Sequence, residues 1–305
     1  MREHLLEIVL FTAAAGFAML GFTVDEGSGR GYVPGPRDPR GLRVVTWNVG
    51  GARDHGRSMP DEHVGHVASV LRELNADLVL LQEVRHAGQV EQVVTALDGP
   101  WVALTSRGPG RLVALLHRIR AAAPTSSVLP LRRERDLLEV ICHLDHAKLI
   151  AVVNLHASAT SAKRRNAMIG RAADALASAR NVSAMIIAGD FNLDVDLDKR
   201  RDLFTDDEHL DVETYNYVTR HFADAAINTG STAEPDRRLD YIFIGGDGFS
   251  MVQAGPWKAN RIGDMDHDPV VADLVWRPRA QATSLDLHHQ GHKDHENTRL
   301  ENTLK

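Results

Sequence analysis

Side chains that could bind a metal ion or move a proton follow apolar segments at several points along the middle of the chain. In chain order they are Asn48, Glu83, His156, Asp190, Asn192, Asp240, Asp266 and His267. Taken singly, each is better explained as a turn residue, a helix cap or a solvated surface group. Strand ends, however, hold polar groups on a rigid support, as catalytic groups commonly are. Because all eight are carboxylates, carboxamides or imidazoles, the set as a whole indicates an active site.

The chemistry that fits these side chains is metal-dependent hydrolysis of a phosphoester. Carboxylate and carboxamide oxygens are hard ligands that suit Mg²⁺, Mn²⁺ or Ca²⁺. Residues 41–278 contain neither a cysteine cluster nor a His-x-x-x-His pair, which disfavours zinc. A hard cation polarises a phosphoryl oxygen, and a histidine oriented by a carboxylate moves protons near neutral pH.

These residues require a set of strands to position them. Segments rich in Val, Ile and Leu predict strands at 42–47, 78–82, 112–117, 137–144, 149–156, 184–188, 239–244 and 270–276. Helical spacing of apolar residues predicts a helix at 64–74, and an Ala- and Arg-rich segment predicts another at 162–180.

The order of these elements predicts an α/β fold. The strands at 112–117, 137–144 and 149–156 have no helix between them, which suggests antiparallel neighbours. Strand-helix-strand units elsewhere suggest parallel neighbours. A mixed sheet, or two such sheets, covered by helices is therefore expected.

The chain of 305 residues divides into four parts by composition. Residues 1–24 are mostly apolar, and the uninterrupted stretch 8–24 reaches the short limit for spanning a bilayer. A signal anchor is preferred to a cleaved signal peptide, with the following domain outside the cytoplasm; a buried helix is the alternative. Residues 25–40 are predicted to be a Gly/Pro linker, 41–278 the single catalytic domain, and 279–305 a disordered His-rich tail.

Charge and cysteine content narrow the function further. The formal net charge of -6 argues against a protein that simply coats nucleic acid, although it leaves room for an enzyme with a bound cation. The single cysteine, Cys142, excludes an intramolecular disulfide. A monomer is expected.

Six short blocks occur in a defined order from about residue 42 to 276. They are Thr-Trp-Asn at 46–48, Leu-Gln-Glu-Val at 81–84, Asn-Leu-His at 154–156, Gly-Asp-Phe-Asn at 189–192, Leu-Asp-Tyr-Ile-Phe at 239–243 and Asp-His-Asp-Pro-Val at 266–270. Together they resemble the endonuclease/exonuclease/phosphatase superfamily, which includes deoxyribonuclease I, abasic-site endonucleases, neutral sphingomyelinases and inositol polyphosphate 5-phosphatases. The resemblance implies a four-layer α/β sandwich, in which two mixed β-sheets pack face to face between outer helices.

The same resemblance implies a role for each residue at the metal end of the site. Glu83 corresponds to the principal metal ligand, helped by Asn48 and Asp266. One residue departs from the usual pattern, because Met265 stands where the last block usually has a serine. Since Asp266 and His267 remain, we expect this change to tune the activity and not to abolish it.

At the catalytic end, the resemblance implies proton and phosphate handling. Asp190 would orient or deprotonate the attacking water, and Asn192 would hold water or phosphate. His156 would contact the phosphate or the leaving group. His267 would act in acid–base chemistry or transition-state stabilisation, with its ring oriented by Asp240. Whether Asp190 or His267 is the base is left open.

A second departure concerns His156, whose counterpart in several nucleases pairs with a glutamate on a middle strand. Glu134 and Glu139 lie in the corresponding region, but neither is a clear equivalent.

The substrate is less strongly indicated. Arg85 and Arg165 are candidate phosphate contacts, and Arg135 is a third arginine with similar reach. DNA is the first expectation, and a phospholipid or small phosphate ester is the alternative. A catalytically dead binding scaffold is the rival class, and retention of the whole set of site residues counts against it.

Overall fold

A computed structural model describes residues 31–51, 58–118, 128–145, 148–195, 210–258 and 261–277. The predicted apolar segment at 1–24 and the His-rich tail at 279–305 lie outside these ranges. Within them, no helix has the length and apolar character needed to cross a membrane.

The first sheet has six strands in the order β11-β12-β1-β2-β4-β3. Their bounds are Gly41–Asn48 (β1), Leu78–Val84 (β2), Trp101–Thr105 (β3), Leu112–Arg118 (β4), Phe249–Pro256 (β11) and Val270–Trp276 (β12). Strands β1 and β2 are parallel, as predicted for a strand-helix-strand unit, and the other pairs are antiparallel.

The second sheet also has six strands, in the order β5-β6-β7-β8-β10-β9. Their bounds are Val128–Glu134 (β5), Leu137–Asp145 (β6), Lys148–His156 (β7), Ala184–Asp190 (β8), Ala223–Asp224 (β9) and Asp240–Gly245 (β10). The antiparallel pairing predicted for β6 and β7 is confirmed. The same prediction is wrong for β4, because β4 pairs with β2 and β3 in the first sheet.

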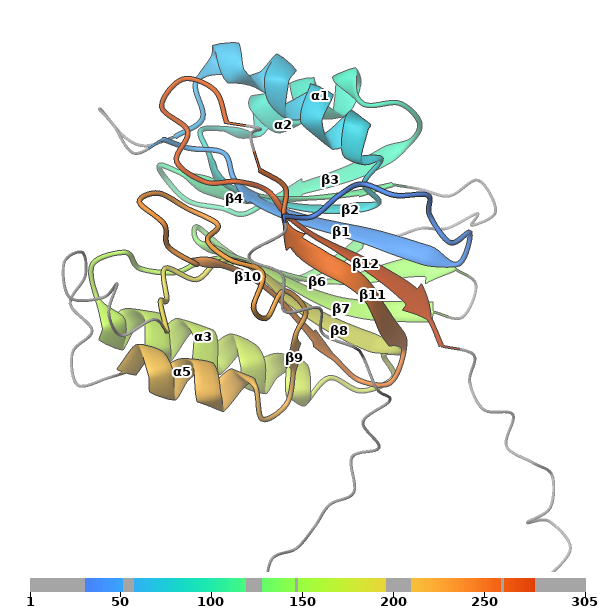
Figure 1. Cartoon of the computed structure of the whole chain (residues 1–305), viewed down its shortest axis with the longest axis vertical. Coiled ribbons are helices and arrows are strands. Elements are labelled where there is room, and N and C mark those ends of the chain that lie inside the picture. Colours follow the sequence, from blue (N-terminus) through green and yellow to red (C-terminus); the bar gives the residue numbers. More distant parts are fainter. Residues whose placement is uncertain are drawn as a thin grey trace, which may run out of the picture.

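Four layers are stacked in the order helices, sheet, sheet, helices (Figure 1). Helices α1 (Val64–Leu74) and α2 (Ala87–Ala96) cover the first sheet, and helices α3 (Ala162–Ala177) and α5 (Leu210–Val218) cover the second. Three buried apolar clusters fill the spaces between successive layers. The fold is therefore the α/β sandwich of two mixed sheets that the blocks of sequence imply.

The elements that the sequence did not predict lie mostly at sheet edges. Strands β3, β5, β9 and β11 are the four edge strands of the two sheets. An edge strand pairs on one side only and tolerates charge and proline. Strand β5 accordingly carries Pro130 and two arginines, and β11 ends at Pro256, so neither presents a continuous apolar segment. Helix α3 also ends at Ala177, before the predicted boundary.

Two buried amides join the sheets directly beneath the predicted site. The Nε2 atom of Gln82 on β2 donates to Oδ1 of Asn154 on β7 at 2.8 Å and to the hydroxyl of Thr46 at 3.1 Å. Both amide side chains are fully buried. Because Gln82 precedes Glu83 and Asn154 lies two residues before His156, this contact fixes the site residues of one sheet relative to those of the other.

Gly189 on β8 lies closely against the main chain of Leu155 on β7. Its φ is 146°, and a Cβ atom added there would lie 1.9 Å from the carbonyl oxygen of Leu155. We expect Gly189→Ala to lower the free energy of unfolding by about 3 kcal/mol or more, because backbone would have to move. Urea unfolding followed by circular dichroism measures this.

The matched control for that substitution is Gly170→Ala, on α3. A Cβ added at Gly170 meets no atom within 4 Å. This variant should be as stable as the wild type or up to about 1 kcal/mol more stable, because alanine favours a helix. Equal unfolding midpoints for the two variants would contradict the steric argument at Gly189.

Candidate active site

The structure brings the eight predicted side chains together at one edge shared by the two sheets. Five lie at or just after the ends of strands β1, β2, β7 and β8, and the other three lie next to them at the start of β10 or just before β12. Seven line a cavity of about 460 Å³, namely Asn48, Glu83, His156, Asp190, Asn192, Asp266 and His267. Asp240 is fully buried behind His267.

Asp190 is the residue on which the polar side chains converge. Its Oδ2 atom accepts a hydrogen bond from Nδ2 of Asn48 at 2.9 Å. The same oxygen lies 3.5 Å from Nε2 of His156 and 3.9 Å from Nε2 of His267. Its other oxygen, Oδ1, accepts from the main-chain N–H of Asn192 at 2.8 Å. The carboxylate is therefore held in one orientation while it faces both histidines.

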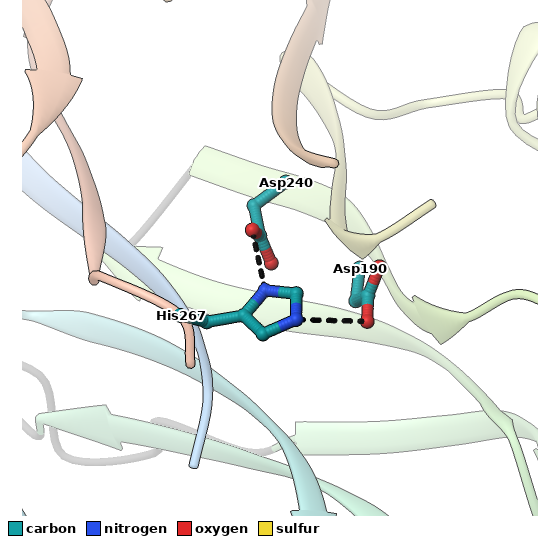
Figure 2. Close-up of side chains that lie close together, drawn as sticks. All are labelled: Asp190, Asp240 and His267. Carbon is teal, nitrogen blue, oxygen red and sulfur yellow. Dashed lines mark hydrogen bonds and ion pairs between the residues drawn. The ribbon is translucent and has the colours of Figure 1, made fainter. Parts of the chain in front are cut away.

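His267 is held between two carboxylates (Figure 2). Its Nδ1 atom lies 2.8 Å from Oδ2 of Asp240, which leaves Nε2 directed towards Asp190. Burial disfavours the charged imidazolium, but the carboxylates of Asp240 and Asp190 more than offset burial and raise the pKa of His267. The imidazolium form is thus favoured at neutral pH, with a proton available at Nε2.

Thr232 fixes the carboxylate that orients His267, and no motif in the sequence points to this role. The Thr232 hydroxyl donates to Oδ2 of Asp240 at 2.7 Å, and it accepts the main-chain N–H of Asp240 at 3.0 Å. Thr232 lies eight residues before Asp240, outside every motif block. Only the antiparallel return of the chain brings the two residues together.

Glu83 occupies an unusual backbone position at the end of β2. Its φ is 59°, a conformation that non-glycine residues adopt rarely and mostly at functional sites. Its Oε1 atom contacts Nη1 of Arg111 and lies 3.5 Å from Nε2 of His156. Burial, helped by the nearby charges of Asp190 and Asp266, raises the pKa of Glu83 to about 8, although Arg111 opposes this effect.

A divalent cation fits this group of side chains. Glu83, Asp190 and Asp266 are acidic groups crowded at one edge, and their mutual repulsion would be relieved by added positive charge. The oxygen atoms of Asn48 and of these carboxylates are the donors that hard cations prefer.

Within the described residues, Asp190, Asp240 and His267 form another cluster whose possible ligand atoms lie within 4.8 Å of one another. Asp240 Oδ2 already accepts from Thr232 and pairs with His267. We therefore associate this cluster with proton transfer, and the carboxylates around Glu83 with the cation.

In the part of the chain that the structure describes, neither Glu134 nor Glu139 pairs with His156. Glu139 lies 3.7 Å from Arg132, and Glu134 also pairs with that arginine at 3.9 Å. The acidic groups next to the His156 ring are Asp190 and Glu83, each at 3.5 Å. Burial lowers the pKa of His156, so its ring is more readily neutral than that of His267.

The prediction that Arg165 contacts phosphate is wrong. Arg165 is fully buried, and its Nε and Nη2 atoms each lie 3.0 Å from an oxygen of Asp211 on α5. Its Nη1 atom donates to the carbonyl oxygen of Ser158 at 2.9 Å, in the loop that lines the cavity. Arg165 therefore supports the loop after His156 and does not line the cavity itself.

Replacement of Arg165 by methionine should accordingly affect stability. Breaking a buried ion pair by removing one of its partners typically costs about 3–5 kcal/mol. We expect a loss of that order in urea unfolding of Arg165→Met. Normal stability with a raised KM would instead return Arg165 to a substrate-binding role.

Arg85 provides the control for this experiment. Its side chain is 49% exposed, lies 3.9 Å from Asp61, and is not among the residues that line the cavity. Arg85→Met should change stability by no more than about 0.5 kcal/mol, as surface substitutions usually do.

Four other arginines line the cavity, namely Arg111, Arg135, Arg164 and Arg237. All four lie outside the motif blocks, and Arg135 alone is a candidate phosphate contact from the sequence. Arg237 is 2% exposed and pairs with Asp194 at 3.1 Å, and Arg135 pairs with Asp136 at 2.6 Å. These arginines place four guanidinium groups around the cavity, beside five carboxylates, namely Glu83, Asp136, Asp190, Glu234 and Asp266.

Comparison with known proteins agrees with this architecture. The structure of an endonuclease/exonuclease/phosphatase from Beutenbergia cavernae DSM 12333 has a TM-score of 0.56 and 22% identity, over 78% of this chain and 72% of that one. Truncated Caenorhabditis elegans TDP2 has a TM-score of 0.54 and 17% identity, over 77% of this chain and 98% of that one. A mannosyl-6-phosphatase of Bacteroides thetaiotaomicron VPI-5482 has a TM-score of 0.54 and 17% identity, over 77% of this chain and 99% of that one.

At these identities the structural matches establish the fold alone. No curated protein sequence matches the chain significantly. The sequence model of the endonuclease/exonuclease/phosphatase family, however, matches residues 45–261. That range contains five of the six motif blocks in full or nearly so, together with the strands that carry Glu83, His156 and Asp190. This chain therefore belongs to the endonuclease/exonuclease/phosphatase family.

Proposed function

We propose that this protein is a divalent-metal-dependent phosphodiesterase that cleaves nucleic acid. The observation that carries the proposal is the convergence on one Asp190 oxygen of Asn48, His156 and His267, at 2.9, 3.5 and 3.9 Å. Glu83 lies beside them, 3.5 Å from the His156 ring. Hydrolysis of phosphoesters is the reaction of this family, and the site contains the groups needed to hold a phosphate and move its protons.

Glu83, Asn48 and Asp266 would hold the cation, with Mg²⁺ or Mn²⁺ as the favoured ions and Ca²⁺ also compatible with oxygen ligands. When bound, such a cation polarises a phosphoryl oxygen and stabilises the charge that develops on it. The buried carboxylate of Glu83, only 7% exposed, is suited to be the anchoring ligand.

Side chains of the site then accept and donate the protons of the reaction and contact the phosphate. Asp190, fixed by Asn48 and by the main chain of Asn192, accepts a proton from the attacking water. His267 donates from Nε2 to the phosphoryl or leaving oxygen, while Asp240 holds Nδ1. His156, whose Nε2 atom lies 3.5 Å from the same Asp190 oxygen that faces His267, contacts the phosphate.

Nucleic acid is favoured by the arginines that line the cavity, since guanidinium groups bind phosphates well. A second candidate is a phospholipid head group or a small phosphate ester. It is favoured by the cavity itself, because about 460 Å³ accommodates a small anionic group without a long binding groove.

The test is to incubate the full chain with Mg²⁺ or Mn²⁺ and plasmid DNA, sphingomyelin, a phosphoinositide or bis(p-nitrophenyl) phosphate, beside Asp190→Asn. Cleavage of DNA that the variant lacks supports the proposal. Cleavage of a lipid or small ester alone moves the substrate to the second candidate. If nothing is cleaved, or if the variant equals the wild type, the hydrolase assignment fails.

We also propose that the apolar residues 5–24 attach the protein to a membrane, with the catalytic domain outside the cytoplasm. Fractionation of cells that express the full chain tests this. Recovery in the membrane fraction, with the domain accessible to added protease in intact cells, supports attachment. Recovery in the soluble fraction argues against it.

A further inference from the structure

Arg111 is the cavity arginine that contacts the principal metal-ligand candidate. It directly precedes β4, and its Nη1 atom contacts Oε1 of Glu83. That same oxygen lies 3.5 Å from Nε2 of His156. The Arg111 side chain is 37% exposed and that of Glu83 is 7% exposed. The guanidinium group therefore reaches a buried carboxylate from the open side of the cavity.

Two of the other three cavity arginines pair with different carboxylates. Arg237 pairs with Asp194 at 3.1 Å, and Arg135 pairs with Asp136 at 2.6 Å. Neither partner is a proposed metal ligand, so these pairs can persist when a cation binds. The contact between Arg111 and Glu83 competes with a cation, because it occupies Oε1 and places a like charge beside the carboxylate that would hold the cation.

We propose that Arg111 is a displaceable counter-charge: it neutralises Glu83 in the metal-free protein and moves to the substrate phosphate when the cation binds. This inference rests on the proposed function. A guanidinium group stays charged at every relevant pH, and its planar fork binds carboxylate and phosphate equally well. Its half-open position leaves the side chain room to turn from one anion to the other.

The exchange makes two binding events depend on each other. A cation must displace Arg111 from Glu83, which weakens metal binding while no anion is present to receive the guanidinium. A phosphate in the cavity receives it and so strengthens metal binding. By linkage, the cation strengthens anion binding by the same factor. Arg111 would thus favour occupation of the site by cation and substrate together.

The experiment is a titration of the full-length protein with Mn²⁺, followed by the electron paramagnetic resonance of free Mn²⁺, without any added tetrahedral anion. We expect Arg111→Met to bind Mn²⁺ about tenfold more tightly than the wild type, the scale of one hydrogen bond to a charged group. Arg135→Met is the matched control, because it removes the same charge from the same cavity. It should change Mn²⁺ affinity by less than about twofold, because Arg135 pairs with Asp136 and not with a proposed metal ligand.

A second titration contains sodium sulfate as a tetrahedral dianion, with ionic strength kept constant by sodium chloride. Sulfate should raise the Mn²⁺ affinity of the wild type more than that of Arg111→Met. Arg111→Lys keeps the positive charge but lacks the planar guanidinium fork. Its Mn²⁺ affinity should lie between that of the wild type and that of Arg111→Met. Urea unfolding of each variant confirms that the comparison is made on folded protein.

Three results would overturn the counter-charge role: equal or weaker Mn²⁺ binding by Arg111→Met, an equal gain for Arg135→Met, or an equal sulfate effect in the wild type and Arg111→Met. Glu83→Gln separates this inference from the proposed function. If Glu83→Gln binds Mn²⁺ normally, the metal site itself is misassigned. If it loses Mn²⁺ while Arg111→Met matches the wild type, only the role of Arg111 fails.

Discussion

Substitution of His267 by alanine is expected to lower kcat by about 10²- to 10⁴-fold, the usual cost of removing a proton-transfer group. The geometry gives the reason. Asp240 holds Nδ1 at 2.8 Å, and Nε2 faces the cavity 3.9 Å from Asp190. Alanine removes the proton donor but leaves the cation ligands in place. The measurement is single-turnover hydrolysis with saturating Mn²⁺, in parallel with Mn²⁺ binding, which should be unchanged.

The control for His267→Ala is Asp240→Asn, which keeps the imidazole and removes the charge behind it. The Asp240 carboxylate raises the pKa of His267, so the wild type keeps His267 protonated to higher pH. Since the protonated form is the proposed donor, activity should fall on the alkaline side of the pH profile. In Asp240→Asn this fall should move to lower pH. If the alkaline limb of the pH profile is not shifted in Asp240→Asn, or if His267→Ala keeps the wild-type kcat, His267 is not the proton donor.

The second large effect is expected for Glu83→Gln, which should lose most Mn²⁺ binding and at least about 10³-fold in kcat/KM. A catalytic cation supplies several kcal/mol of transition-state stabilisation, and each tenfold in rate corresponds to about 1.36 kcal/mol. Glutamine has nearly the same shape as glutamate but offers a neutral amide, so the loss reports on charge and coordination. Calorimetric titration with Mn²⁺ and hydrolysis assays measure the two quantities separately.

Measurements of unfolding show whether Glu83→Gln loses Mn²⁺ binding and activity at the site or because the protein unfolds. Burial raises the pKa of Glu83 to about 8 although Arg111 opposes this effect, so in the metal-free folded protein the carboxylate that pairs with Arg111 becomes fully charged only as the pH rises through 8. The contribution of Glu83 to the free energy of unfolding is therefore fully present below the ordinary pKa of glutamate. This contribution declines as the pH rises towards 8. Metal-free Glu83→Gln should escape this decline and unfold at an equal or higher urea concentration at pH 8. A lower midpoint would mean that lost activity reflects unfolding.

Glu139 offers a matched glutamate outside the cavity. It is 8% exposed on β6 and lies 3.7 Å from Arg132, so it shares with Glu83 a buried position next to an arginine. Glu139→Gln should keep Mn²⁺ binding and hydrolysis within about twofold of the wild type, because Glu139 is not among the residues that line the cavity. Loss of both activities would show that Glu→Gln exchange is damaging irrespective of the site.

The positions of the inner strands could be predicted because they are buried on both faces. A strand such as β8, Ala184–Asp190, is a continuous apolar segment that ends in a carboxylate, and such segments are recognisable from composition. Edge strands such as β5 lack that signature. Membership of a sheet was not predictable either: β4 joins β2, and not β6, because pairing depends on contacts between distant segments.

The sequence by itself determined which residue types stand at the ends of the inner strands, and so the chemistry of the site. Asp190, Glu83 and His267 are recognisable because their blocks are local in the chain. Only the tertiary structure decided what the arginines do. Arg165 is held by Asp211, 46 residues away, and Arg111 meets Glu83, 28 residues away. An arginine carries the same charge in either place, and its partner is chosen by how helices and sheets pack around it.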